Sequence, residues 1–142
     1  MECKEICVDA RKSSPEERKE GQQQTQLLFQ INHTMPYTEE YDHLVQELFG
    51  NNLGEGSRIT PPLNGACIRN MKIGKNVLIN SNLLAMARGG IIIEDNVMIA
   101  ANVQLITNNH DPYDLWILPC KQVLIKEYAW IGAGATILPG VC

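Results

Sequence analysis

His110 is the residue of this chain whose type and position most favour catalysis. The chain contains three histidines, and His110 alone lies in the carboxyl-terminal half, in the segment Thr107-Asn108-Asn109-His110. A neutral imidazole can accept a proton near physiological pH, and a positioned general base contributes on the order of 10²–10⁴-fold to a reaction rate. The alternative is a loop histidine without a chemical role.

Composition argues against several other classes of function. A net charge of -4 over 142 residues gives no general attraction to nucleic acid or acidic membranes. No window approaches the roughly 18 apolar residues of a membrane span, and the first twenty residues lack the apolar core of an export signal. The five cysteines, at positions 3, 7, 67, 120 and 142, are odd in number and form no CxxC pair. They predict reduced thiols and a cytoplasmic location.

Two helices are predicted before residue 50. The segment Ser14-Pro15-Glu16-Glu17 supplies an N-cap, a proline at the first helical position and an acid three residues after the cap, which predicts a helix start. Gly21 is a candidate interruption of this helix. A second helix is predicted between Thr38 and Gly50, because apolar residues recur there at i, i+3, i+4 and i+7. These residues are Tyr41, Leu44, Val45 and Leu48.

Beyond residue 70 the helical period gives way to a spacing of six. Aliphatic residues recur at this spacing, with a two-residue slip and one insertion, and small apolar residues recur four positions later in the hexad. Six residues per side and three sides make an 18-residue coil, whose aliphatic residues point inward and stack about 4.8 Å apart. The inward positions are Ile73, Ile79, Ile93, Ile99, Leu105, Ile125, Ile131 and Ile137, and the small apolar positions are Val77, Val97, Val103, Ala129, Ala135 and Val141.

This spacing predicts a mainly β fold, a parallel β-helix of hexapeptide repeats behind an N-terminal helical segment. The alternative, a buried sheet in an α/β fold, would need crossover helices, and none is visible after residue 50. We expect one compact domain, with the helical segment over residues 1–50 and the β-helix over residues 51–142. Residues that suit unusual corner conformations surround the predicted corners. They are Asn76, Asn80, Asn82, Asn96, Asn102, Gly132 and Gly134.

Three segments, IGKNVLINSN, EDNVMIAANVQLITNNHDPYD and YAWIGAGATILPGV, together resemble the hexapeptide-repeat acetyltransferases, most closely the maltose and galactoside O-acetyltransferase branch. Upstream, LLFQINHTMP, the Tyr41 helix and ITPPLN are similar to the helical lead-in of that branch, so the match covers about residues 25 to 142. The resemblance implies a left-handed β-helix and a homotrimer with active sites between subunits. It also implies acetyl transfer from the co-substrate acetyl-CoA to a small hydroxylated acceptor, such as a sugar.

The resemblance further implies roles for four residues. His110 aligns with the family's catalytic histidine, which takes the proton of the attacking hydroxyl. Trp130 and Ala133 match the segment that borders the pantetheine arm of coenzyme A and offers a backbone N–H to the oxyanion. Asn80 matches an asparagine that contacts the acceptor hydroxyl, although an asparagine at a β-helix corner needs no functional reason. No residue is assigned to a metal.

Departures from the branch leave a second interpretation open. Ala66 and Arg88 stand where the sugar-binding branch has a serine and an aspartate, and the insertion after His110 is shorter than in the galactoside enzymes. The chain ends at Cys142, where the family continues with further coils that hold coenzyme A. The alternative is a truncated, catalytically impaired protein that serves as a trimeric binding or assembly scaffold. A zinc enzyme of the γ-carbonic anhydrase kind needs three histidines around the metal, whereas the β-helix half has one.

Overall fold

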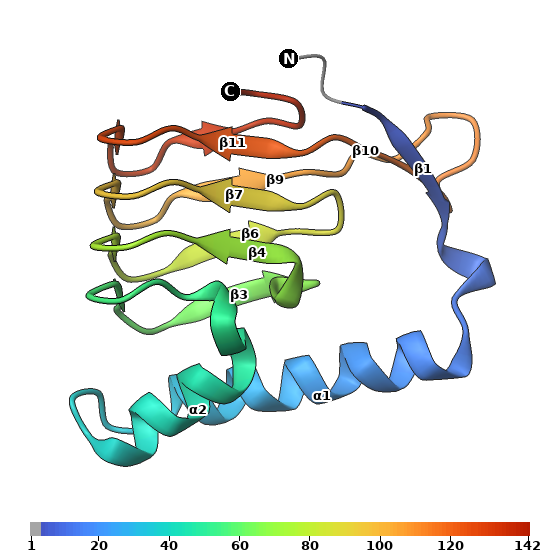
Figure 1. Cartoon of the computed structure of the whole chain (residues 1–142). Coiled ribbons are helices and arrows are strands. Elements are labelled where there is room, and N and C mark those ends of the chain that lie inside the picture. The colour runs from blue at the N-terminus through green and yellow to red at the C-terminus, as the bar shows by residue number, and fades with distance from the viewer. Residues whose placement is uncertain (1–3) are drawn as a thin grey trace.

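The chain winds through three parallel sheets that form the sides of a β-helix. The computed structural model describes residues 4–142, and Figure 1 shows the coils stacked above two helices. Each turn of the β-helix contributes one strand to each sheet, except that the first turn reaches sheet I only through the isolated bridge between Leu53 and Ile73. Sheet I contains β4 (Met71–Ile73), β7 (Ile91–Ile93) and β11 (Val123–Ile125); sheet II contains β2 (Arg58–Ile59), β5 (Leu78–Ile79), β8 (Met98–Ile99) and β12 (Trp130–Ile131); sheet III contains β3 (Leu63–Ala66), β6 (Leu83–Met86), β9 (Gln104–Ile106) and β13 (Thr136–Ile137).

The inward side chains stack in register, as the spacing of six predicts. Ile79 pairs with Ile99 of the next coil, and Ile99 pairs in turn with Ile131. Ile99 is 2% exposed, and the corner residues Val77, Val97 and Val103 are fully buried. Ile131 and Ile137 pack on the same core but are only partly buried, because they lie in the uppermost coil. The predicted phase of the hexads is therefore confirmed.

Left-handed backbone conformations turn the corners between the sheets. At the I–II corner, between sheets I and II, φ is 54° at Asn76 and 60° at Asn96. At the II–III corner, φ is 67° at Asn82 and 62° at Asn102. Asparagine adopts this conformation at a lower cost than most residues, so the predicted corner role of these four residues is confirmed.

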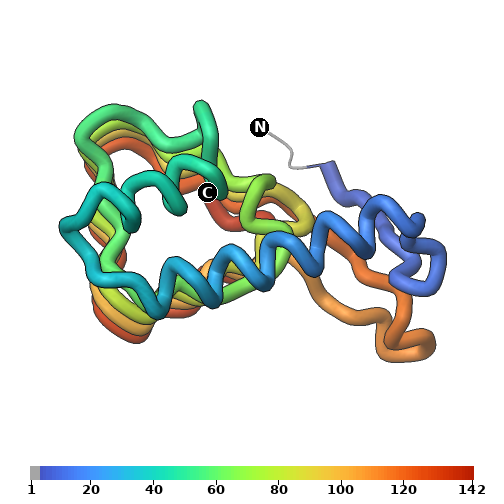
Figure 2. The backbone as a smooth tube through the Cα atoms, turned by 90° about the horizontal axis from the view of Figure 1, so that it is seen from below, coloured from blue at the N-terminus to red at the C-terminus, as the bar shows by residue number. Residues whose placement is uncertain are grey.

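Helices α1 (Pro15–Asn32) and α2 (Glu39–Phe49) close the lower end of the β-helix (Figures 1 and 2). Ser14 caps α1 with a complete capping box, as predicted. The predicted interruption at Gly21 is wrong, since α1 is continuous. A glycine inside a helix costs roughly 0.5–1 kcal/mol relative to alanine, which is less than the helix gains by burying Leu27, Leu28 and Ile31 under the coils.

The end of α1 is fixed to the lowest strand of sheet III by a side chain. Asn32 donates from Nδ2 to the carbonyl oxygen of Leu63 at 2.8 Å and accepts from the Leu63 N–H at 2.9 Å. Its amide thus satisfies the backbone groups that a further strand would otherwise pair.

Two elements lie outside the sequence-based predictions. The hexad pattern predicts the β-helix from residue 71 onward, but β2 and β3 form an earlier coil. The strand β1 (Ile6–Asp9) pairs antiparallel with β10 (Ile117–Cys120), which belongs to the insertion after His110. Short 3-10 turns cover Ala10–Lys12, Gly50–Asn52 and Ile68–Asn70.

The structure describes four of the five cysteines and both helices. Cys7, Cys67, Cys120 and Cys142 are free, while Cys3 lies outside the described residues. Burial raises the pKa of the Cys120 thiol. Within residues 4–142, neither helix combines the length and the apolar character that a membrane crossing requires.

Candidate active site

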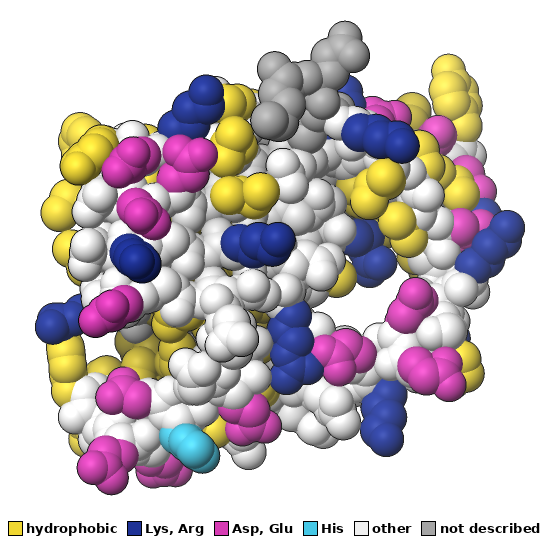
Figure 3. All heavy atoms as spheres, in the orientation of Figure 1, with side chains coloured by type: hydrophobic (Ala, Val, Ile, Leu, Met, Phe, Trp, Pro, Cys, Tyr) yellow, Lys and Arg dark blue, Asp and Glu magenta, His cyan; other side chains and the backbone are white. Residues whose placement is uncertain are grey.

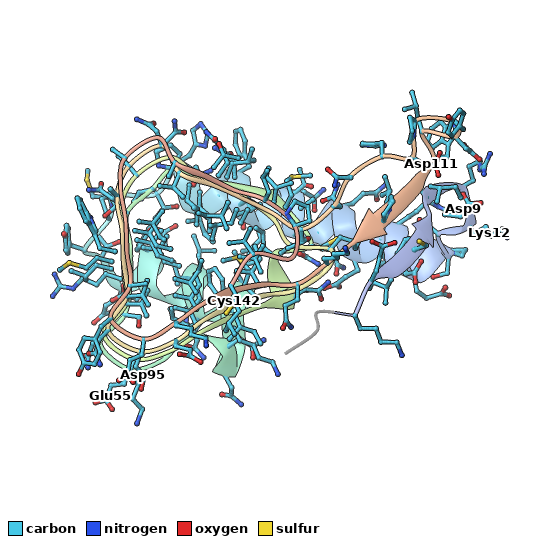
Figure 4. The ribbon with its side chains drawn as sticks, turned by 90° about the horizontal axis from the view of Figure 1, so that it is seen from above. Asp9, Lys12, Glu55, Asp95, Asp111 and Cys142 are labelled. Atoms are coloured by element: carbon cyan, nitrogen blue, oxygen red, sulfur yellow. The ribbon has the colours of Figure 1, made fainter. Side chains whose placement is uncertain are left out.

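His110 lies on a loop that leaves the β-helix at the III–I corner, after β9. We call residues 107–116 the His110 loop. Its first half runs alongside β10: the N–H of Asn109 donates to the carbonyl oxygen of Pro119, and the N–H of Asp111 donates to that of Ile117, both at 2.9 Å. Figure 4 shows Asp111 on a projection far from Asp95 and Glu55, which mark the I–II corner.

The geometry of His110 fixes its tautomer. Its Nδ1 lies 2.6 Å from the backbone carbonyl oxygen of Leu115. A carbonyl oxygen can only accept, so Nδ1 carries a proton. In the neutral ring Nε2 then has a free lone pair, and it meets no hydrogen-bond partner within residues 4–142. The side chain is exposed, so a substrate can reach it. This is the state that a general base requires.

The N-terminal segment holds the His110 loop from outside. Arg11 donates from Nη2 to Oδ2 of Asp114 at 2.8 Å, and the N–H of Ala10 donates to the carbonyl oxygen of Trp116 at 2.9 Å. Arg11 also donates from Nε to Oδ1 of Asp9 at 2.9 Å, and this hydrogen bond holds the pKa of the Asp9 carboxyl below its usual value. None of these contacts follows from the hexad pattern, and no motif in the sequence marks Arg11 or Asp114.

Asn80 lies at the II–III corner, where its side chain is exposed. Its Oδ1 accepts from the N–H of Ser81 at 2.7 Å. This bond orients the amide and leaves Nδ2 without a partner among the residues that the structure describes. Asn80 can therefore donate a hydrogen bond to a ligand.

Trp130 and Ala133 lie in the uppermost coil. Trp130 occupies an outward position of sheet II, directly above Met98, and is 74% exposed. Ala133 is exposed at the II–III corner, and its N–H has no partner within the described part of the chain. An N–H in this position is free to stabilise negative charge on a bound group.

A single chain does not bring the four predicted residues together. Asn80 and Ala133 lie at the II–III corner and Trp130 lies in the strand before it, whereas His110 follows sheet III and lies beyond the III–I corner. The length of a sheet III strand separates the base from the other three residues. The predicted site residues therefore form two separate groups, one at each end of sheet III, which we call the two partial sites.

A hollow of about 970 Å³ lies between α1, the N-terminal segment and the III–I corner. Ala66 and Arg88, the two positions that depart from the sugar-binding branch, both line it. Arg88 is half-buried, and its guanidinium forms no hydrogen bond or ion pair with any described residue. The acidic side chains of the hollow are engaged: Glu17 accepts from the N–H of Ser14, and Glu20 pairs with Arg69. Within residues 4–142 no cluster of three or more potential ligands could hold a metal ion.

The stacked hexads define the class of protein as a hexapeptide-repeat β-helix, which here carries an exposed histidine on a projecting loop. The sequence is 30% identical over 144 residues to galactoside O-acetyltransferase of Escherichia coli (strain K12). This alignment covers 96% of this chain and 68% of the relative. The sequence is 35% identical over 108 residues to nodulation protein L of Rhizobium leguminosarum bv. viciae, covering 72% of this chain and 56% of that protein. The chain belongs to the hexapeptide-repeat acetyltransferases, in the galactoside O-acetyltransferase branch. No family model matches it.

Solved structures agree with this assignment and establish the handedness of the coil. The fold matches galactoside acetyltransferase in complex with coenzyme A with a TM-score of 0.82, at 26% identity over 91% of this chain and 66% of that chain. It matches a hexapeptide-repeat acetyltransferase from Vibrio cholerae with a TM-score of 0.84, at 30% identity over 90% of this chain and 74% of that chain. The β-helix is left-handed, as predicted. The chain spans between 56% and 68% of the length of the first three curated relatives.

Proposed function

We propose that this protein is an acetyl-CoA-dependent O-acetyltransferase that acts on a sugar or a related hydroxyl compound. The observation that carries the proposal is the hydrogen bond from Nδ1 of His110 to the Leu115 carbonyl oxygen, at 2.6 Å, which leaves Nε2 as a free base on an exposed loop. The relatives named for O-acetylation and the neighbour that contains coenzyme A support it. Acetyl-CoA is the acetyl donor in this proposal.

Each residue then has one chemical task. His110 takes the proton of the acceptor hydroxyl at Nε2 as the oxygen attacks the thioester carbonyl. Ala133 donates its N–H to the carbonyl oxygen, where negative charge develops. As the carbon–sulfur bond breaks, His110 returns the proton to the leaving thiolate, so the imidazole ends the cycle neutral. Asn80 donates from Nδ2 to the acceptor, and the exposed face of Trp130 borders the donor.

We propose that the site is completed between subunits of a homotrimer. Two apolar surfaces support this arrangement. The outward positions of sheet II carry Leu78, Met98 and Trp130 in a column, and hydrophobic side chains line that left edge of the coils in Figure 3. The His110 loop exposes Tyr113, Leu115 and Trp116. A loop that contacts a different surface of the next copy is a head-to-tail interface, and such an interface closes into a ring when the rotation between copies is a whole fraction of a turn. The two partial sites of neighbouring chains would then meet.

We further propose that the acceptor carries a negative charge. Arg88 lines the hollow beside the III–I corner and its guanidinium has no partner among the described residues, while the carboxylates there are already engaged. Guanidinium groups bind carboxylate and phosphate with paired hydrogen bonds. Neutral galactosides are accordingly expected to be weaker acceptors than acidic hydroxyl compounds. A cytoplasmic location is proposed as well, supported by the free thiols of the four cysteines that the structure describes, and the net charge of -4 supports the absence of a nucleic-acid partner.

Two measurements test the proposed activity. Calorimetric titration with coenzyme A should show binding, and acetyl transfer to a panel of hydroxyl acceptors should fall at least about a hundredfold in His110→Ala with an unchanged melting temperature. His43→Ala is the matched control, because His43 is exposed on α2, away from the coils' upper end. Equal transfer rates in wild type and His110→Ala would remove the histidine from the mechanism. A trimer that binds no coenzyme A would favour the scaffold function instead.

A further inference from the structure

One peptide unit connects His110 to a carboxylate. The carbonyl oxygen of the Leu115–Trp116 peptide accepts a hydrogen bond from Nδ1 of His110, at 2.6 Å. The N–H of the same peptide donates to Oδ1 of Asp114 at 3.2 Å. The imidazole and the carboxylate therefore lie at the two ends of a single polarisable group.

The carboxylate is in turn held by the N-terminal segment. Oδ2 of Asp114 accepts from Nη2 of Arg11 at 2.8 Å, across 103 positions of sequence. Arg11 is itself oriented by two hydrogen bonds to Asp9, of 2.9 and 3.0 Å. The N–H of Ala10 donates to the carbonyl oxygen of Trp116 at 2.9 Å. The residues on both sides of the Leu115 carbonyl are thus fixed to the segment 9–11.

This arrangement has two physical effects on the base. An N–H that donates to a carboxylate polarises its peptide, which makes the carbonyl oxygen a stronger acceptor for Nδ1–H. The contacts to Arg11 and Ala10 also restrict an exposed loop whose tip would otherwise sample many conformations. Both effects favour the tautomer in which Nε2 is the free base.

We propose that Asp114 and Arg11 are positioning residues that keep His110 in the Nδ1–H tautomer through the Leu115–Trp116 peptide. The tautomer of His110 does not depend on the proposed function, whereas the expected effect on the reaction rate does. It assigns a role to the strand β1 and the turn behind it, which lie outside the β-helix and which the proposed reaction does not otherwise use.

The chain offers a matched control for a purely structural effect. Lys121 and Glu5 form a second ion pair, at 3.4 Å, between the same N-terminal segment and the insertion. This pair lies beyond β10 and does not contact residues 114–116. Removing it loosens β1 without touching the peptide that binds His110.

The test reads the tautomer directly by ¹⁵N NMR of the imidazole rings in the full chain, at a pH where the rings are neutral, with the His110 signals assigned from His110→Ala. The wild type should carry the proton on Nδ1. Arg11→Met and Asp114→Ala should shift a large fraction to Nε2–H, while Arg11→Lys and Lys121→Met should retain the wild-type spectrum. Asp114→Asn, which keeps the size of the side chain, serves if Asp114→Ala does not fold.

A rate measurement follows from the same variants. Arg11→Met and Asp114→Asn should lower kcat about tenfold, with the KM values for acetyl-CoA and acceptor changed less than about twofold, as for the loss of an outer hydrogen-bond partner. An unaltered tautomer in all Arg11 and Asp114 variants overturns the proposal, and so does an equal change in Lys121→Met. A tautomer shift in a protein without transfer activity supports the positioning role and refutes the proposed function.

Discussion

Tyr128 occupies the same left-handed corner position as Asn96, one coil higher: φ is 64° at Tyr128 and 60° at Asn96. The N–H of Tyr128 donates to the carbonyl oxygen of Asp95, as the N–H of Asn96 donates to that of Lys75. A left-handed conformation costs a bulky residue roughly 1–2 kcal/mol, and asparagine less. Tyr128→Asn should therefore raise the free energy of unfolding by about 1 kcal/mol, measured as a higher urea midpoint at an unchanged slope.

Lys126→Asn is the control for this substitution. Lys126 is exposed at the same corner and has a negative φ, so an asparagine there should leave the midpoint within about 0.5 kcal/mol of wild type. Equal stabilisation by both variants would show that the corner conformation is not the cause.

Ile99→Asp should prevent stable folding of the β-helix. Ile99 is 2% exposed between Ile79 and Ile131, and a carboxylate there would be desolvated without a partner. The loss should exceed about 4 kcal/mol, visible as the loss of cooperative thermal unfolding. Asn102 lies at the II–III corner that follows the strand of Ile99, and its φ is 62°. Glycine adopts this conformation readily, so Asn102→Gly should remain folded. A folded Ile99→Asp protein with normal melting would contradict the inward phase.

Tyr41 should make stability fall between pH 10 and pH 12. Burial raises its pKa to about 12, and its hydroxyl donates to the Ile59 carbonyl oxygen at 2.7 Å. Above pH 10 the unfolded chain loses the Tyr41 proton while the folded chain keeps it until about pH 12, so unfolding releases a proton and becomes easier. Tyr41→Phe should lose about 1 kcal/mol at neutral pH and show a flatter decline across this range in denaturant titrations. Parallel curves for the two proteins would refute the assignment to Tyr41.

Light scattering should give a mass of about three times the 15.9 kDa of one chain. Met98→Asp should produce monomers, because it places a charge in the exposed column of sheet II, where Met98 is 53% exposed. Met35→Asp, at a residue 73% exposed between the helices, should leave the mass unchanged. A monodisperse wild-type monomer at micromolar concentration would exclude a site shared between chains.

Acceptors with a carboxylate or phosphate should be acetylated in preference to neutral ones of the same skeleton. Arg88→Ala should reduce kcat/KM for the acidic acceptor about tenfold, the loss expected for a hydrogen bond to a charged group, and change it little for the neutral one. Lys72→Ala, at an exposed position of sheet I, is the control for net charge. An enzyme that prefers the neutral acceptor would show that Arg88 faces something other than substrate.

The hexad pattern by itself determined the β-helix, its inward phase and its corners. This was possible because each contact in a coil repeats in the next coil: Ile79, Ile99 and Ile131 pack in the same way. The same residue type therefore recurs at a fixed spacing along the sequence. The hexad pattern is weaker in the sequence of the first coil. Leu53 and Ile59 are six residues apart, but two members do not make a period, and the pairing of Leu53 with Ile73 appears only in the structure.

The proposed base, His110, was also identified from the sequence, whereas its surroundings were decided by the tertiary structure. His110 was marked by its position after a hexad strand and by the resemblance of the segment around it. The Leu115 carbonyl, Asp114 and Arg11 were not, since each of their contacts occurs once, without a repeat or a motif to reveal it, and the contact between Arg11 and Asp114 joins segments 103 positions apart. The separation of Asn80 from His110 likewise depends on which corners of the coil they occupy. Local and repeating interactions can be predicted from the amino-acid sequence. A single long-range contact forms only when the whole fold brings its two residues together.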